Sequence, residues 1–201
     1  MDTALILAGG ASSRFRGFKA LQEIAGTPMI RRVVDAMAPL AGEVLVCVAD
    51  ETAADAMRPV LPAVTFVSDR HRGIGPVEGL RCGAEAAHGD RLLVAPCDAP
   101  LLRSDLYRLL GGALGNHQAA VPRIDVFDPI RAVYRTSAVR GLLEEGREGP
   151  RSPSAIVDRL DVVFVEAEQL RSIDPRLDSF LDVNTRRDLD EVVLRLHAPG
   201  P

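Results

Sequence analysis

Short apolar runs alternate with longer stretches of helical periodicity along this chain. The runs cover residues 4–8, 44–48, 64–67 and 92–95. Runs of this length, bounded by glycine, proline or aspartate, are typical of strands buried inside a sheet. Because they recur at roughly 30-residue spacing with helical segments between them, they predict βαβ units and a parallel sheet.

Helix start and stop signals separate these strands. Thr27 followed by Pro28 predicts a helix N-terminus capped by the threonine hydroxyl, and Pro39 predicts the end of that helix. A second helix is expected over residues 51–58, and Pro76 is expected to open a third. The third helix would bury Val77, Leu80, Ala84 and Ala87. The helices therefore have apolar faces that can cover the sheet.

The second half of the chain is less regular. We expect strands over 118–121, 130–134 and 162–165, helices over 136–145 and 185–196, and a polar, turn-rich segment over 146–153. We find no internal repeat. The pattern predicts an α/β fold in three layers, Rossmann-like, with a mostly parallel central sheet and helices on both faces. One domain over 1–201 is expected, with a first half over 1–100 and a second over 101–196.

Composition narrows the function classes. The chain has 201 residues, 47% of them hydrophobic and 26% charged, and its net charge of −4 gives no footprint for nucleic acid or an anionic membrane. The three cysteines lack CxxC spacing, which argues against a structural zinc site and fits a reducing compartment. There is no signal-peptide pattern and no apolar run of about 20 residues. A soluble, cytoplasmic protein is expected.

Polar and glycine residues follow three of the predicted strands. Gly9 and Gly10 follow the first, Asp69 the third and Asp98 the fourth. In an open parallel sheet, ligands bind beyond the carboxyl ends of the strands. We therefore expect these residues to converge on one binding site.

The loop after the first strand has the chemistry of a phosphate site. Its glycines allow backbone amides to approach a phosphate, Ser12 and Ser13 add hydroxyl donors, and Arg14 and Lys19 supply charge for a triphosphate. Lys19 is followed by alanine rather than serine or threonine, and the GxGxxG spacing is absent. The loop is therefore neither a P-loop nor a dinucleotide fingerprint.

The two aspartates suggest different roles. Asp98, between two prolines, offers the hard oxygen ligand that Mg²⁺ takes together with substrate phosphates. The same sequence pattern is also expected of an aspartate that only stabilises a turn or caps a helix. Asp69 could contact a base or ribose, with Gly75 allowing close backbone approach, or it could simply pair with Arg70 or Arg72. The four histidines have no metal-ligand spacing and are expected at the surface.

These segments resemble a known family. Residues 7–14 with Lys19-Ala20-Leu21 resemble the opening signature of NTP-transferase-like enzymes, and the molybdenum cofactor guanylyltransferases are the most similar group. Four further segments agree in order: Gly75-Pro76-Val77-Glu78-Gly79-Leu80, Pro96-Cys97-Asp98-Ala99-Pro100, Pro129-Ile130-Arg131-Ala132-Val133-Tyr134 and Asp182-Val183-Asn184-Thr185. The resemblance therefore covers nearly the whole chain.

The resemblance implies a reaction in which GMP passes from GTP to molybdenum-bearing molybdopterin, with Mg²⁺ as cofactor, giving the guanine dinucleotide form and pyrophosphate. Catalytic roles would fall to Lys19, Asp98 and Arg14, and Asp98 would bind the metal. The implied GTP-binding residues are Leu7, Ala8, Gly9, Gly10, Ser12, Ser13, Arg14, Lys19, Asp69, Gly75 and Asp98. The acceptor side would include Arg151, Asn184 and Thr185. A protein that delivers molybdopterin, or a molybdoenzyme that receives the product, would be a candidate partner.

Several alternatives stay open. Cytidylyltransferases acting on the same cofactor tend to carry alanine where this chain has Gly9, which favours guanine here. A sugar-1-phosphate nucleotidyltransferase would share the fold, and a non-catalytic nucleotide-binding domain would be expected to lack Lys19 or Asp98. The chain departs from the family at Arg16 and Gly17, and Asp50 stands where some members carry asparagine. In the polar segment either Arg147 or Arg151 could face the acceptor.

Overall fold

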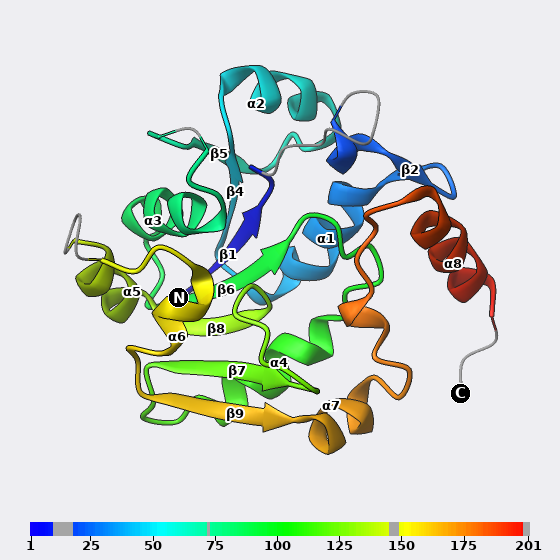
Figure 1. The fold of residues 1–201 in the computed structure, drawn as a ribbon. Coiled ribbons are helices and arrows are strands. Elements are labelled where there is room, and N and C mark those ends of the chain that lie inside the picture. The colour runs from blue at the N-terminus through cyan, green and yellow to red at the C-terminus, as the bar shows by residue number, and fades with distance from the viewer. Residues whose placement is uncertain (10–17, 72, 145–148, 199–201) are drawn as a thin grey trace.

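The computed structural model describes residues 1–9, 18–71, 73–144 and 149–198. Its centre is a sheet of seven strands in the order β5-β4-β1-β6-β8-β7-β9 (Figure 1). The strands are β1 Asp2–Leu7, β4 Glu43–Val48, β5 Thr65–Ser68, β6 Arg91–Pro96, β7 Ala119–Arg123, β8 Ala132–Arg135 and β9 Val162–Glu166. A small hairpin of β2 Glu23–Ile24 and β3 Thr27–Pro28 stands apart from this sheet.

The sheet is mostly parallel, as the sequence predicts. β1 runs parallel to both β4 and β6, β4 to β5, and β7 to β9. β8 is antiparallel to its neighbours β6 and β7. Because β8 reverses direction, β7 and β9 point the same way as β6. The carboxyl ends of six strands therefore lie along one edge.

Helices cover both faces of the sheet, which confirms the predicted three layers. The α-helices are α1 Met29–Met37, α2 Glu51–Met57, α3 Pro76–Ala86, α4 Ser104–Ala113, α5 Thr136–Leu143, α6 Pro153–Val157, α7 Ala167–Ile173 and α8 Arg186–His197. Neighbouring residues of a strand point to opposite faces of the sheet. Ile6 belongs to the hydrophobic cluster on the face covered by α1, α2, α4 and α7. Leu5 belongs to the cluster on the other face, which is covered by α3, α5 and α6. This period of two is what strands buried on both faces require.

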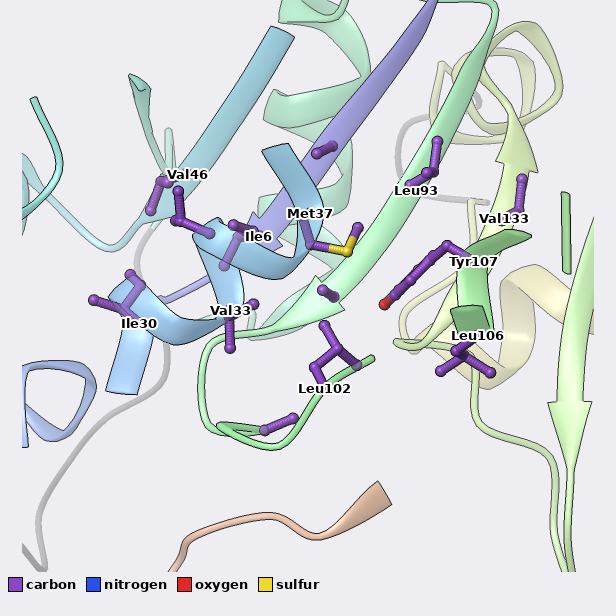
Figure 2. Close-up of a cluster of buried hydrophobic side chains, with 14 of the residues drawn as sticks. Ile6, Ile30, Val33, Met37, Val46, Leu93, Leu102, Leu106, Tyr107 and Val133 are labelled. Atoms are coloured by element: carbon purple, nitrogen blue, oxygen red, sulfur yellow. The ribbon is translucent and has the colours of Figure 1, made fainter. Parts of the chain in front are cut away.

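The first of these clusters is closely packed. Figure 2 shows side chains of α1 and α4 gathered over β1 and β6. Met37 and Tyr107 are both fully or almost fully buried there, and the Tyr107 hydroxyl donates a 2.6 Å hydrogen bond to the carbonyl of Val94. That bond satisfies the one polar atom the tyrosine brings into the core.

The structure corrects the predicted start of α1. Thr27 pairs with Ile24 in the hairpin and does not cap the helix, and Pro28 is the residue that precedes α1. The turn between the two short strands uses Ala25 and Gly26, both with positive φ (50° and 75°). The threonine is therefore held in strand pairing two residues before the helix begins at Met29.

Other predicted elements shift only at their ends, and three helices are not predicted by the sequence. The helix expected over 51–58 ends at Met57, where a 3-10 turn over Arg58–Val60 follows. The helix expected over 136–145 is described to Leu143. The three unpredicted helices are α4, α7 and α6, and α6 begins at Pro153, the last residue of the expected turn-rich segment, with the Ser152 hydroxyl as its cap.

Within the described residues, no helix combines the length and the apolar character that crossing a membrane requires. The cytoplasmic location stays a prediction.

Candidate active site

Backbone hydrogen bonds continue the sheet past the strand ends and fix the residues that follow. The amide of Ala8 donates to the carbonyl of Cys47 at 2.7 Å, and the amide of Cys97 donates to the carbonyl of Leu7 at 3.1 Å. The amide of Asp69 donates to the carbonyl of Val48 at 2.9 Å. These bonds place the first residues after β1, β5 and β6 side by side, as the topology predicts.

A cavity of about 300 Å³ opens at this edge of the sheet. Gly9, Asp69 and Asp98 all line it, so the expected convergence is confirmed. The lining residues are Leu7, Ala8, Gly9, Phe18, Lys19, Ala20, Cys47, Met57, Asp69, Gly75, Pro76, Gly79, Pro96, Cys97, Asp98, Ile130 and Asn184. The size is at the lower end of the range for small-molecule sites.

One end of the cavity holds a cluster of three polar side chains from distant parts of the chain. The Lys19 ammonium lies 2.7 Å from Oδ2 of Asp98 and 2.8 Å from Oδ1 of Asn184. The carbonyl of Asp98 also accepts a 2.9 Å hydrogen bond from the amide of Val183. The cluster joins the turn after β6 to the segment that precedes α8.

The other end of the cavity presents an unpartnered carboxylate. Oδ1 of Asp69 is buried and has no hydrogen-bond partner among the described residues. Burial, with a further contribution from the charge of Glu78, raises the pKa of Asp69 to about 6. A buried acceptor without a donor is costly unless something else supplies one. Asp69 is therefore the residue best placed to receive N–H groups of a ligand.

Two glycines make room for this carboxylate. A Cβ atom at Gly9 would lie 3.1 Å from Oδ2 of Asp69. A Cβ at Gly79 would lie 3.1 Å from Cδ2 of Leu7 and 3.4 Å from Cβ of Cys47. Both positions are tighter than ordinary side chains tolerate, so the narrow floor of the cavity depends on glycine at these sites.

Ion pairs to α3 hold the wall that carries Asp69. Glu78 is 1% exposed and accepts from the His71 amide at 3.1 Å and from its Nδ1 at 3.0 Å. Arg70 pairs with Glu85 at 2.5 Å rather than with Asp69. The alternative in which Asp69 pairs with Arg70 is therefore not what the structure shows, whereas Arg72 lies outside the described residues.

Of the remaining predicted site residues, one lines the cavity, two are not among the described lining residues, and the rest lie outside the described part of the chain. Gly75 lines the cavity with a φ of 86°, which favours glycine. Thr185 caps α8 by accepting from the Asp188 amide at 3.3 Å, and neither it nor the exposed Arg151 is among the cavity-lining residues that the structure describes. The residues Gly10, Ser12, Ser13, Arg14, Arg16, Gly17 and Arg147 lie outside the described part of the chain.

Sequence reasoning missed several lining residues. Cys47, Met57 and Phe18 are ordinary core or loop residues by pattern, and no sequence signal points to them. Gly79 stands in the Gly-Pro-x-x-Gly segment, which was noticed for its resemblance rather than for its proximity to the cavity. Ile130, from the segment 129–134 that resembles the family, also lines the cavity.

The donor set suits a hard cation that shares its shell with a substrate. No group of three or more His, Cys, Asp or Glu side chains that could hold a metal occurs in the described residues. Asp98 and Asn184 nevertheless direct a carboxylate and an amide oxygen at one ammonium ion. Two such oxygens plus phosphates are the ligands that Mg²⁺ commonly takes, so the residues present fit that ion.

The fold and the site are those expected of a nucleotidyltransferase: a mostly parallel sheet whose carboxyl edge carries, around one cavity, the cluster of Lys19, Asp98 and Asn184 together with Asp69. Residues 4–170 match the family described as the MobA-like NTP transferase domain. The chain belongs to this family, and the resemblance seen in the sequence is confirmed.

Individual relatives agree. The probable molybdenum cofactor guanylyltransferase of Methanosarcina mazei is 30% identical over 95% of this chain and 89% of its own length. The protein of the same name from Haloferax mediterranei is 31% identical over 92% and 90%. Among solved structures, molybdopterin-guanine dinucleotide biosynthesis protein A from Archaeoglobus fulgidus has a TM-score of 0.82 and 28% identity, and the match covers 98% of both chains.

Proposed function

We propose that this protein transfers GMP from GTP to molybdenum-bearing molybdopterin and releases pyrophosphate. The names of its relatives support the substrates. One observation carries the reaction class: Lys19, Asp98 and Asn184 meet in a cavity that Asp69 also lines, and the buried oxygen of Asp69 has no partner within residues 1–9, 18–71, 73–144 and 149–198. That arrangement places charge for phosphates and a hydrogen-bond acceptor for a base within a single site.

The donor nucleotide binds in the half formed by residues 1–100. Guanine presents adjacent N–H donors, on N1 and N2, and a carboxylate accepts two such donors side by side. Asp69, with room made by Gly9, is the acceptor for them. Leu7, Ala8 and Gly75 contribute backbone around the base and ribose. The triphosphate runs from there toward Lys19, with Gly10, Ser12, Ser13 and Arg14 of the first loop also contacting it.

The transfer needs positioning and charge more than a base. An oxygen of the acceptor's phosphate attacks the α-phosphorus of GTP, and the bond from that phosphorus to the bridging oxygen breaks, so pyrophosphate leaves with the electron pair. A phosphate monoester is already anionic near neutral pH, so no side chain has to remove a proton. Lys19 and Arg14 neutralise charge that builds on the phosphates.

Mg²⁺ is the metal we propose for this site, held by Asp98 with help from the Asn184 oxygen. When bound, it neutralises phosphate charge and polarises the α-phosphoryl group. Lys19 has to release Asp98 for that purpose, and the triphosphate offers the ammonium a new partner. The chain itself contributes the Asp98 carboxylate oxygen and the Asn184 amide oxygen, both of which it directs at the Lys19 ammonium.

The acceptor binds in the half formed by residues 101–196. Asn184 and Ile130 both line the cavity, which supports a position for the molybdopterin phosphate on the side of β8. Arg151 and Thr185 contribute to this side in the proposal, although neither is among the described residues that line the cavity. Both halves belong to one nucleotidyltransferase domain.

The test is pyrophosphate release with each of the four NTPs, Mg²⁺ and molybdenum-bearing molybdopterin. We expect release with GTP, and Asp98→Asn as the matched variant should cut turnover by about two to three orders of magnitude while leaving the fold intact. Release with CTP but not GTP would reject the guanine assignment and favour a cytidylyltransferase. A protein whose melting temperature no NTP raises would be neither enzyme nor nucleotide-binding module.

A further inference from the structure

Arg131 is a buried arginine that joins the start of β8 to a segment near the C-terminal helix. It lies directly before β8 and is 2% exposed. Its Nε donates to the carbonyl of Ser179 at 2.9 Å, and its Nη1 lies 2.5 Å from Oδ2 of Asp128. Its Nη2 donates to Oδ1 of Asp182. Each guanidinium nitrogen therefore has a partner: one lies three residues before Arg131, and the other two lie in the distant segment that contains Ser179 and Asp182.

The charges of this group are mutually dependent. Burial opposes the charge of Arg131, but Asp128 and Asp182 outweigh it and raise the pKa of the guanidinium. Burial also raises the pKa of Asp182, with Arg131 opposing the shift and the charge of Asp98 adding to it. Without Arg131, two partly buried carboxylates would lose their counter-charge, and Asp182 would face Asp98 unscreened.

The partner of Arg131 belongs to the segment that completes the charged cluster. We call residues 179–184 the closing segment. After Asp182, the amide of Val183 donates to the carbonyl of Asp98 at 2.9 Å. The next residue, Asn184, accepts from the Lys19 ammonium at 2.8 Å. One residue separates the side chain that Arg131 grips from the side chain that reaches the cavity.

We infer that Arg131 is a positioning residue for the acceptor side of the site, acting through Asp182 on Asn184. The inference rests on the proposed function for its kinetic consequence. Arg131 does not line the cavity and its nitrogens are occupied, so it binds no substrate itself. It fixes the closing segment from behind, and the planar fork of an arginine is what allows one residue to hold three oxygens at once.

The kinetic test separates the two substrates. In Arg131→Gln we expect the dissociation constant for GTP to change several-fold less than the specificity constant for molybdopterin, because Asp69 and Gly9 on the proposed base side lie outside the segments that Arg131 contacts. The specificity constant for molybdopterin should fall by about tenfold or more, as it does when groups that orient a site are removed. Arg131→Lys, which keeps the charge but not the fork, should recover part of the loss.

Arg91→Gln is the matched control. Arg91 pairs with Asp2 through Nε at 2.8 Å, at the opposite edge of the sheet from the cavity. Its replacement also removes an arginine–carboxylate pair, although the Arg91 side chain is 37% exposed and that of Arg131 only 3%. It should lower the melting temperature without separating the GTP and molybdopterin constants. The positioning role is wrong if Arg131→Gln only lowers the melting temperature, as expected for Arg91→Gln. It is also wrong if binding of GTP and of molybdopterin weakens equally as stability is lost.

A measurement without turnover keeps the inference independent of the proposed reaction. The side-chain amide signal of Asn184, assigned by its loss in Asn184→Ser, should move in the ¹⁵N spectrum of Arg131→Gln and stay in place in Arg91→Gln. Asp182→Asn, which retains an oxygen for Arg131, serves if Arg131→Gln does not fold, and should move the same signal less. An unmoved Asn184 signal in folded variants overturns the inference. A protein that fails to use GTP but moves this signal would contradict the proposed function alone.

Discussion

Asp69 combines a buried oxygen that has no hydrogen-bond partner among the described residues with a pKa raised to about 6. Its value as an acceptor of N–H groups depends on its charge, and the carboxyl protonates as the pH falls through about 6. We predict that GTP binding weakens below this pH, as measured by calorimetry across a pH series. Asp69→Asn should bind GTP weakly at every pH of the series, and a parallel decline in that variant would remove Asp69 as the cause.

The same residue should cost stability in the absence of nucleotide. The folded pKa of about 6 lies above the ordinary value of 3.8, so between these values the folded state holds a proton that the unfolded state has lost. The free energy of unfolding therefore falls as the pH rises through this window. Above it, Asp69→Asn is expected to melt at a higher temperature than the unaltered protein. A lower melting temperature would mean that the carboxylate has a stabilising partner.

Lys19 stands where the cation of the reaction is proposed to bind. Its ammonium is held 2.7 Å from Asp98 and 2.8 Å from Asn184. We predict that Lys19→Gln binds Mn²⁺ more tightly than the unaltered protein when no nucleotide is present, measured by electron paramagnetic resonance. Turnover should nevertheless fall by about 10²-fold, because charge on the triphosphate is lost. Lys19→Arg is the control that retains the charge, and Mn²⁺ affinity equal to or below the unaltered protein in Lys19→Gln would contradict the prediction.

At the scale of elements, α3 lies unusually close to the sheet because of its glycines. A Cβ at Gly83 would overlap the Leu5 side chain and lie 2.9 Å from Sγ of Cys47. Gly83→Ala should therefore lower the free energy of unfolding by about 1–3 kcal/mol. Gly141→Ala in α5, with no atom within 4 Å of the new Cβ, should instead gain up to about 1 kcal/mol. Chemical unfolding measures the free energy of unfolding of the two variants. If both variants change it by the same amount, helix propensity rather than packing determines the effect.

The sequence predicts the buried strands and α3 well because each has a single period and clear boundaries. α4 was missed, and it ends in Gly111, Gly112 and Ala113, where glycines weaken the helical signal. Thr27 was assigned to the wrong role because a two-residue pairing with Ile24 leaves no periodic pattern. The antiparallel direction of β8 follows from its pairing partners rather than from its own residues, so local patterns do not contain it.

At the scale of the whole molecule, Glu43 in β4 ties β1 and the loop before β6 together at the edge of the sheet opposite the cavity. It accepts from the Thr3 hydroxyl at 2.5 Å and from the His88 amide at 2.6 Å. Burial alone would raise the pKa of Glu43, but the hydrogen bonds from Thr3 and His88 outweigh it and lower the pKa from 4.5 to about 2. This carboxylate therefore stabilises the fold fully above pH 4.5 and loses that contribution as the pH falls toward 2.

The consequence can be measured against Glu43→Gln. We expect the unaltered protein to exceed the variant in free energy of unfolding near neutral pH, and the difference to shrink through the window from pH 4.5 to 2. Urea unfolding at a series of pH values provides the comparison. A difference that stays constant with pH would show that packing, and not the ionised carboxylate, accounts for the effect.

The sequence predicts those site residues that directly follow a strand. It does not predict the residues that reach the site through contacts between distant parts of the chain. Gly9, Asp69 and Asp98 follow from topology, because parallel strands end at one edge. Asn184 came from resemblance, and Arg131 was noticed only as part of a strand-like segment. Its role depends on Ser179 and Asp182, which are 48 and 51 residues away along the chain, and no local pattern encodes such a meeting.

The hydrogen bond between Lys19 and Asn184 spans 165 positions. A ribosome makes the chain from its N-terminus, so this bond has to wait until residue 184 has been added. Contacts this distant in sequence are slow to form, because a long loop has to close before they stabilise anything. The cluster that joins Lys19 to Asn184 is therefore among the last parts of the cavity that a newly made chain can complete.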